Sequence, residues 1–253
     1  MAPPTNRPLF RRIFSWYLFP IFGSIVWVGT LLGLLIDWIV AGSPHYPSMD
    51  SEGQTVAYIS DIAAEFLKPL FIAGASVTSV CFILSLFGAR WLRHRGRIIP
   101  NTSLAQRVFS FVAITGAIVG GVGLILLSIF DTKRHKTTHR VFLTVFCAGV
   151  LVSALGTVLE YWRLEHHHRW SRALKWSFWT KAVFFVVELG LAIAFGVLLH
   201  EQKNNAGAIV EWVTALVFTG YLLSFIFDLL PGAKSHTGEF KDVEKLRPQS
   251  AHY

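Results

Sequence analysis

Residues 108–162 read VFSFVAITGAIVGGVGLILLSIFDTKRHKTTHRVFLTVFCAGVLVSALGTVLEYW. Two long apolar runs flank a polar insert, SIFDTKRHKTTHR at 128–140, which holds an aspartate and several basic and imidazole groups. Each run is about as long as the ~20 residues that a helix needs to cross the hydrocarbon core of a bilayer. The stretch therefore predicts two membrane-spanning helices joined by a polar connection.

The rest of the chain has the same character. Of its 253 residues, 53% are hydrophobic and only 15% are charged, whereas a soluble domain has about 25% charged residues. We therefore predict an all-α polytopic membrane protein with a single bundle over residues 15–230. Its six transmembrane helices are expected at about 15–39, 67–89, 106–130, 141–162, 177–199 and 208–230. The first is expected to be a retained signal anchor, since its apolar stretch exceeds that of a signal peptide.

The distribution of basic residues predicts the orientation. If the N-terminus is inside, 17 of the 23 Lys and Arg residues fall in inner segments and six in outer ones. Inner segments carry the excess of Lys and Arg, so both termini are expected to be cytoplasmic. Residues 1–14 then form a basic cytoplasmic N-terminus, and 231–253 a cytoplasmic tail that is polar and expected to be disordered. The sequon at Asn101 would face the cytosol and carry no glycan.

The basic residues behind the net charge of +8 cluster beside the spans, so we expect them to face the anionic headgroups of membrane lipids. Nucleic acid is not an expected partner. The histidine run 166–168 is interpreted as part of a basic, aromatic stretch resting on the inner leaflet, and neither a metal nor another cofactor is predicted. The residues expected to bind anionic phospholipids are Lys133, Arg134 and Arg140 outside and Arg93, Arg95, Arg97, Arg169 and Arg172 inside.

Ionisable residues inside the predicted spans are costly unless they are paired or near an edge. Asp37 and Glu211 lie near the outer edge, Asp228 near the inner edge, and Glu188 is the deepest. Lys181 is about 10 Å from Glu188 along the helix axis, too far for a direct bond. Glu188 therefore needs a partner on another helix or a proton, in a structural role or in a functional polar pocket.

Small residues predict where helices approach closely. Three spans carry them at helical spacing: Gly29 and Gly33; Gly116, Gly120, Gly121 and Gly123; Gly190 and Ala194. Packing within one chain is the simplest interpretation of all three.

Asp131, His135 and His139 recur at intervals of four, which on a helix places them on one face. Three interpretations remain open: a helix extension that ties loops together, an acid–base pair acting on a lipid ester, and a zinc site. The metalloprotease pattern is absent, because Lys136 stands where it requires a glutamate. The acidic loop 40–66 is expected to dock on this basic loop, bringing Asp61 toward His135 or Lys133.

Three segments resemble the signatures of the Frag/DRAM/Sfk family: AYISDIAAEFLKPLFIAG (57–74), SIFDTKRHKTTHRVF (128–142) and EWVTALVFTGYLLSFIFDLLP (211–231). The resemblance is greatest to the suppressor-of-four-kinase branch. It implies six spans with both termini cytosolic. It also implies a set of characteristic polar positions: Ser60, Asp61, Asp131, His135, His139, Glu211 and Asp228.

The same resemblance implies a non-enzymatic protein of the plasma membrane that supports phosphatidylinositol 4-kinase signalling and keeps phospholipids asymmetric. The kinase complex would then be a partner. A remodelling enzyme or cofactor for GPI-anchor lipids is the alternative, with a site drawn from His135, His139, Asp131 and Asp61 on the outer face. A second alternative is a lipid or ion conduit with Glu188 at its centre. Golgi, endoplasmic reticulum and lysosome or vacuole are the alternative locations.

Overall fold

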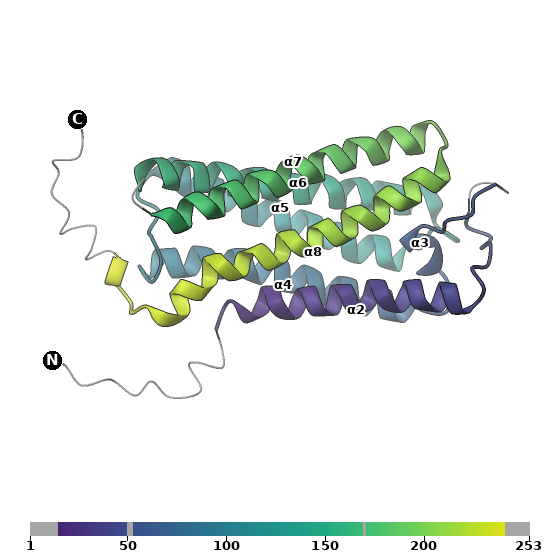
Figure 1. The fold of residues 1–253 in the computed structure, drawn as a ribbon, viewed down its shortest axis with the longest axis horizontal. Helices are drawn as coiled ribbons and strands as arrows, with labels where there is room; N and C mark the ends of the chain where they lie inside the picture. The colour runs from purple at the N-terminus through teal and green to yellow at the C-terminus, as the bar shows by residue number, and fades with distance from the viewer. Residues whose placement is uncertain (1–14, 50–52, 169–170, 241–253) are drawn as a thin grey trace.

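The computed structural model describes residues 15–49, 53–168 and 171–240, and within those ranges all of its regular secondary structure is helical, with no strand (Figure 1). Six of its helices are long and apolar enough to cross a membrane, which confirms the all-α, six-span prediction. The seventh is a short helix between the first two. The helices are α2 (Leu18–Val40), α3 (Ile59–Ile62), α4 (Lys68–His94), α5 (Leu104–Ile129), α6 (Lys136–His167), α7 (Arg172–His200) and α8 (Asn204–Lys234).

Several helices continue past their apolar stretch. α6 begins five residues before the predicted span and ends five residues after it, because its flanking residues are polar yet still helical. α5 begins at a capping box in which Ser103 and Gln106 each accept a hydrogen bond from the other's backbone NH group. α8 runs through Pro231 to Lys234.

The segment 231–240 corrects the prediction of a disordered tail that begins at residue 231. Residues 231–234 belong to α8, and the Gly238 and Phe240 amides then donate hydrogen bonds to the carbonyls of Arg95 (3.0 Å) and Gly96 (3.1 Å). The backbone of this segment is thus paired with the α4–α5 connection. The remainder of the predicted tail, 241–253, lies outside the described residues.

α5 and α6 pack with their backbones in contact. A Cβ added to Gly116 would lie 2.6 Å from the Ser153 nitrogen, and one added to Gly120 would lie 2.9 Å from the Val150 nitrogen. The prediction of close packing through the glycines of this span is confirmed. For Gly190 of α7 and Gly29 of α2 it is wrong, since a Cβ at either would meet no atom within 4 Å.

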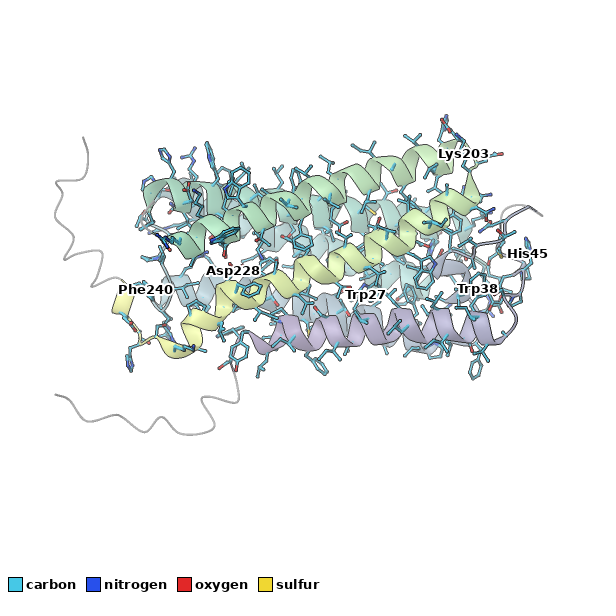
Figure 2. The ribbon with its side chains drawn as sticks, in the orientation of Figure 1. Trp27, Trp38, His45, Lys203, Asp228 and Phe240 are labelled. Atoms are coloured by element: carbon cyan, nitrogen blue, oxygen red, sulfur yellow. The ribbon has the colours of Figure 1, made fainter. Side chains whose placement is uncertain are left out.

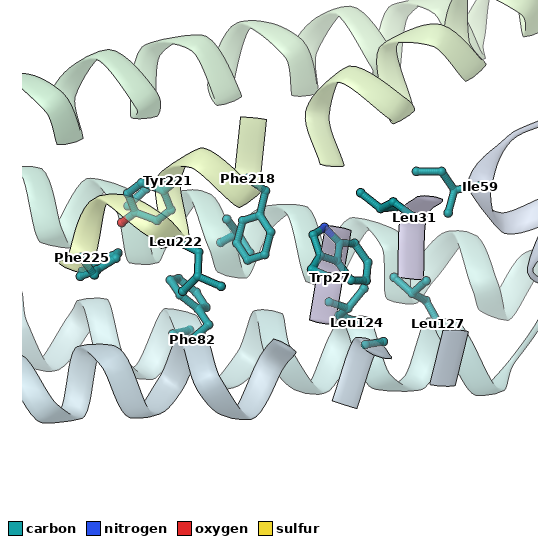
Figure 3. Packing of buried hydrophobic residues seen from close by; sticks show 14 of the residues in the cluster. Trp27, Leu31, Ile59, Phe82, Leu124, Leu127, Phe218, Tyr221, Leu222 and Phe225 are labelled. Atoms are coloured by element: carbon teal, nitrogen blue, oxygen red, sulfur yellow. The ribbon is translucent and has the colours of Figure 1, made fainter. Parts of the chain in front are cut away.

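The core is built around aromatic rings (Figure 3). Phe82 of α4 packs edge-on against Phe218 and Phe225 of α8, with ring centroids 5.5 and 6.3 Å apart. Trp27 of α2 lies further along the bundle and donates a hydrogen bond from Nε1 to the Ala215 carbonyl of α8 (3.2 Å). These contacts fix α2, α4 and α8 to one another.

α7 lies at the periphery of the bundle. It packs against α6 and α8, and only 6% of its most apolar 18-residue window is buried inside the protein. Large apolar side chains such as Val183, Val186 and Ile193 are exposed along it. In a bilayer this face meets lipid tails, which are as apolar as the side chains themselves.

The two ends of the bundle differ (Figures 1 and 2). α2 begins and α8 ends at one end, here called the terminal end, near which Asp228 and Phe240 lie. The connections 41–67, 130–135 and 201–203 lie at the opposite end, here called the loop end, with Trp38, His45 and Lys203. Six crossings place both ends of the described chain on the same side. Which side is cytoplasmic stays a prediction from the charge distribution.

Candidate functional site

The connection between α2 and α4 is held on the start of α8. Asn205 Oδ1 accepts hydrogen bonds from the backbone amides of Thr55 (2.8 Å) and Val56 (2.9 Å). Trp212 Nε1 donates to the Ala57 carbonyl at 3.1 Å. The chain then enters the short helix α3.

Two acidic residues hold α3 in place. Glu211 Oε2 of α8 accepts a hydrogen bond from the Ile59 amide at 2.7 Å, and Asp61 Oδ2 accepts one from the Tyr58 amide at 3.3 Å. Asp61 is buried, and this burial raises the pKa of its carboxyl although hydrogen bonds, first among them one from Ser48, act in the opposite direction. Burial and the nearby Glu211 and Asp61 carboxyls raise the pKa of Tyr58 to about 12.

Asp131 and His135 precede α6 rather than sharing a helix face with His139. α5 ends at Ile129, and residues 130–135 form the turn before α6. The prediction of one helical face is therefore wrong, because the apolar helix stops at the end of the membrane stretch and the polar turn follows it. His135 is exposed and stands edge-on to the Phe130 ring, with centroids 5.5 Å apart.

Asp131 is a structural anchor for this turn. Its carboxylate is 4% exposed and lies 2.5 Å from Lys68 Nζ of α4, and its other oxygen accepts a hydrogen bond from the Arg134 amide at 2.8 Å. Burial alone would raise the pKa of Asp131. The Lys68 and Arg134 hydrogen bonds and charges outweigh that effect and hold the pKa below its usual value.

His139 lies in α6 and is 3% exposed. Its Nδ1 is 2.9 Å from the carbonyl oxygens of both Leu127 and Phe130. Two acceptors at Nδ1 require a proton there, so in the neutral ring Nε2 carries the lone pair. The imidazole thus ties the end of α5 to the start of α6.

The two loops dock as predicted and Lys133 takes part, but its acidic partner is Glu65 rather than Asp61. Lys133 Nζ pairs with Glu65 at 2.8 Å, and the Thr132 hydroxyl donates to the Ser60 carbonyl at 3.4 Å. Asp61 instead faces its own loop, where its carboxyl group accepts hydrogen bonds from the Tyr58 amide and from Ser48. The reason is that the Asp61 carboxyl group caps the start of α3 by accepting a hydrogen bond from the Tyr58 amide.

A pocket of about 50 Å³, here called the loop-end pocket, lies beside these contacts at the loop end. Of the residues that resemble family signatures, it collects Ser60, Asp61, His139 and Glu211, while Asp131 and His135 do not line it. Lys136 and Arg140 of α6 line it as well. The pocket therefore combines carboxyl groups, an imidazole and cationic groups.

Two further spaces adjoin the loop-end pocket. An apolar cavity of about 80 Å³ lies deeper in the bundle and is lined by Glu188 and Glu211 among hydrophobic residues. Glu188 is 6% exposed, and its Oε1 accepts no hydrogen bond within the described residues. A groove of about 760 Å³ runs between α6 and α7, from Arg140 and His200 at the loop end down to Cys147 and Ala192; it is called here the α6–α7 groove.

The terminal end is tied together by buried ion pairs. Arg93 of α4 is 3% exposed, lies 3.3 Å from Glu160 of α6 and stacks over the Tyr161 ring. Asn101 Nδ2 donates to the same glutamate at 2.9 Å. The expectation that Arg93 binds lipid headgroups is therefore corrected, because its guanidinium is inside the protein.

A second pair joins α7 to α8. Lys181 Nζ is fully buried, 3.0 Å from Asp228 and 2.5 Å from the Ser224 hydroxyl, and Ser177 donates to Asp228 at 2.6 Å. The expected burial of Asp228 is confirmed. Lys181, considered as a partner of Glu188, belongs to this pair instead.

The other predicted positions are distributed as follows. Asp37 was expected to be buried and is exposed, because its turn of α2 faces outward. Glu211 is partly buried. Lys133, Arg134, Arg140, Arg95 and Arg172 are exposed, Arg97 is partly buried, and Arg169 lies outside the described residues. His166 and His167 are exposed, whereas His168 is buried.

Sequence reasoning missed the three pairs Lys68–Asp131, Arg93–Glu160 and Lys181–Asp228. A signal existed, since an ionisable residue inside a span requires a partner of opposite charge at a similar depth. For Lys181 and Asp228, the depth within the predicted spans could have been matched. Nothing in the sequence marked the α6–α7 groove. Across the described ranges, no group of three His, Cys, Asp or Glu side chains is arranged to hold a metal ion.

Comparison with known proteins identifies the family. The Frag1/DRAM/Sfk1/Cwh43P N-terminal domain matches residues 15–232. The chain is 32% identical to Protein sfk1 of Schizosaccharomyces pombe over 228 residues, covering 90% of this chain and 67% of that protein. It is 27% identical to Protein SFK1 of Saccharomyces cerevisiae over 188 residues, covering 63% of this chain and 53% of that protein. No solved structure matches. The chain belongs to the Frag1/DRAM/Sfk1/Cwh43P family, and its relatives support the Sfk1 branch.

Proposed function

We propose that this membrane protein supports phosphatidylinositol 4-kinase signalling at the plasma membrane, as a non-enzymatic scaffold that binds lipid and helps keep phospholipids asymmetric across the bilayer. Membership of the Sfk1 branch supports the kinase connection. In this proposal the terminal end faces the cytoplasm, as the excess of Lys and Arg predicts. The kinase complex and anionic lipids are the proposed partners.

The observation that carries the proposal is the exposed basic surface of the terminal end. Arg95, Arg163, Arg172 and Lys175 are exposed there, on the ends of α4, α6 and α7. The buried pairs Arg93–Glu160 and Lys181–Asp228 fix those helix ends relative to one another. A rigid basic surface beside the inner leaflet attracts anionic lipid at about 1 kcal/mol per basic residue.

The location of the kinase tests this proposal. A fluorescent phosphatidylinositol 4-kinase is imaged in cells that lack the protein and express either wild type or Arg95→Gln/Arg163→Gln/Arg172→Gln. The triple variant should leave most of the kinase off the plasma membrane. The control, Lys133→Gln/Arg134→Gln, removes exposed charge from the loop end and should behave as wild type. Equal kinase signal with the triple variant and wild type would contradict the proposal.

A remodelling enzyme or cofactor for GPI-anchor lipids is the second candidate, favoured by one observation. His139 and Asp61 line the same pocket, and the Nδ1 contacts of His139 leave Nε2 as a base. Mass spectrometry of anchor lipids separates the candidates. Anchors that change on deletion and are restored by His135→Ala but not by His139→Gln would support the enzyme, and unchanged anchors would exclude it.

A further inference from the structure

The lining of the α6–α7 groove changes from polar to apolar along its length. Its loop-end rim is polar, with Arg140 and Thr144 on α6 and His200 on α7. About 12 Å further along α7, at 1.5 Å per residue, its lining is Cys147, Ala192 and other apolar side chains. A polar rim at the membrane surface and an apolar floor toward the membrane centre match the two parts of a lipid molecule.

The groove is continuous with the two neighbouring spaces. It shares Leu143, Cys147, Ala192 and Phe195 with the apolar cavity, so its floor leads inward. At the rim it shares Arg140, Leu143, Phe195 and Leu199 with the loop-end pocket. One molecule could therefore place its headgroup at Arg140 and an acyl chain along the groove.

Charges of both signs meet at this rim. Arg140 and Lys136 supply cationic groups, and Asp61 and Glu211 supply carboxyl groups in the same pocket. Glu211 lines the pocket and accepts the Ile59 amide through Oε2, which leaves Oε1 as a further acceptor of the same carboxyl group. A headgroup with a phosphate and a hydrogen-bond-donating ammonium complements both signs.

The volume of the loop-end pocket limits which lipid headgroup it can hold. At about 50 Å³, with 10–15 Å³ needed per water molecule, it accepts a group of a few heavy atoms. A primary ammonium can donate three hydrogen bonds to carboxyl oxygens, whereas a trimethylammonium can donate none. The carboxyl groups therefore select a primary amine over choline, and over headgroups without an amine.

We propose that the α6–α7 groove binds one phospholipid with a primary-amine headgroup, its phosphate at Arg140, its ammonium at Glu211 and Asp61, and one acyl chain between α6 and α7. This site is at the opposite end of the bundle from the basic surface proposed to serve the kinase. It goes beyond that proposed function and is tested without any kinase.

Native mass spectrometry of the purified full chain tests the site. The protein is released from mixed micelles that contain equal amounts of phosphatidylethanolamine, phosphatidylcholine and phosphatidylglycerol with identical acyl chains. We expect the phosphatidylethanolamine adduct to exceed each of the others about tenfold. Equal adducts of all three lipids would overturn the recognition of the amine.

Two glycines of α7 give a matched pair of variants. A Cβ at Gly196 or Gly190 meets no atom within 4 Å, so both positions accept a larger side chain, but only Gly196 lines the groove. Gly196→Phe should reduce the phosphatidylethanolamine adduct at least fivefold, and Gly190→Phe should leave it unchanged. If both variants keep the wild-type adduct, the lipid is not in the groove.

A third variant tests the headgroup contact. Glu211→Gln keeps an oxygen that can accept the Ile59 amide but replaces the second carboxyl oxygen with an NH2 group, which cannot accept a hydrogen bond from an ammonium. It should bring the phosphatidylethanolamine and phosphatidylglycerol adducts to near equality. A preference that stays tenfold in this variant would overturn the assignment of the ammonium to Glu211.

Discussion

At the scale of single residues, Asp131 was a candidate catalytic residue, but in the structure its carboxylate holds the α5–α6 turn against α4. Its carboxylate is shared between Lys68 of α4 and the amide of Arg134. Removing Lys68 leaves a buried carboxylate with one hydrogen bond fewer, which costs about 1–3 kcal/mol. Lys68→Ala should therefore lower the melting temperature measurably. A smaller effect in the Asp131→Asn background than in wild type, measured as a double-mutant cycle, would establish the pairing.

The same carboxylate predicts a pH dependence. The folded-state pKa of Asp131 lies below its unfolded value of about 3.8, so the group contributes stability above that pH and loses the contribution as pH falls through the folded pKa. Wild type should lose more stability than Asp131→Asn when melting is followed from pH 5 to pH 3. Parallel melting curves for the two proteins over that range would contradict the pairing.

Substitution of Glu188 distinguishes a lipid or ion conduit from a bundle in which this residue has only a structural role. Its Oε1 lacks a partner within the described residues and faces an apolar cavity. Burying an unsatisfied polar group costs about 1–3 kcal/mol, so Glu188→Leu should raise the melting temperature. Rescue of the deletion phenotype by Glu188→Leu would exclude a conduit with this residue at its centre, and a loss of function in a stabilised variant would favour one.

At the scale of elements, glycine positions distinguish the packed helices from the peripheral one. A Cβ at Gly116 would collide with the α6 backbone, which cannot move away as a flexible side chain could. Gly116→Ala should cost about 1–3 kcal/mol by overpacking, and Gly190→Ala should cost nothing by that route. Thermal denaturation of the two variants in detergent measures the difference. Equal stability would mean that α5 and α6 do not touch as described.

The elements also show what the sequence could predict. Apolar length located all six long helices, because a span must satisfy its backbone hydrogen bonds internally and so has to be helical. The ends of α6 were missed by five residues each, since helices continue through polar caps that hydropathy does not detect. The tight α5–α6 contact was predicted from its glycines. Gly190 of α7 belongs to a motif of the same kind, yet a Cβ there would meet no atom within 4 Å, so the motif alone does not predict a close contact.

The candidate site was predicted only in part. Ser60, Asp61, His139 and Glu211, four of the polar positions that the resemblance implies, come together at the loop-end pocket. The roles of Asp131 and His135 could not be read from their spacing, because that spacing has meaning only inside a helix and both precede α6. The groove depends on how far α6 and α7 diverge, a property of the packed bundle and not of either segment.

At the scale of the whole molecule, orientation is the prediction on which the proposed function depends. A cysteine introduced at Lys203, at the loop end, should react with a membrane-impermeant maleimide on intact cells. One introduced at Arg172, at the terminal end, should react only after permeabilisation. Both positions are exposed, so accessibility within the protein is matched. The reverse pattern would invert the topology and put the basic surface outside.

If the terminal end supports phosphatidylinositol 4-kinase signalling, the level of phosphatidylinositol 4-phosphate at the plasma membrane should depend on the basic residues exposed there. The lipid is quantified in cells that lack the protein and in the same cells given wild type, Arg95→Gln/Arg163→Gln/Arg172→Gln, or Lys133→Gln/Arg134→Gln. We expect a loss of this lipid on deletion, full restoration by wild type and the loop-end variant, and less than half of that restoration by the terminal-end variant. A level that does not change on deletion, or equal restoration by both variants, would contradict it.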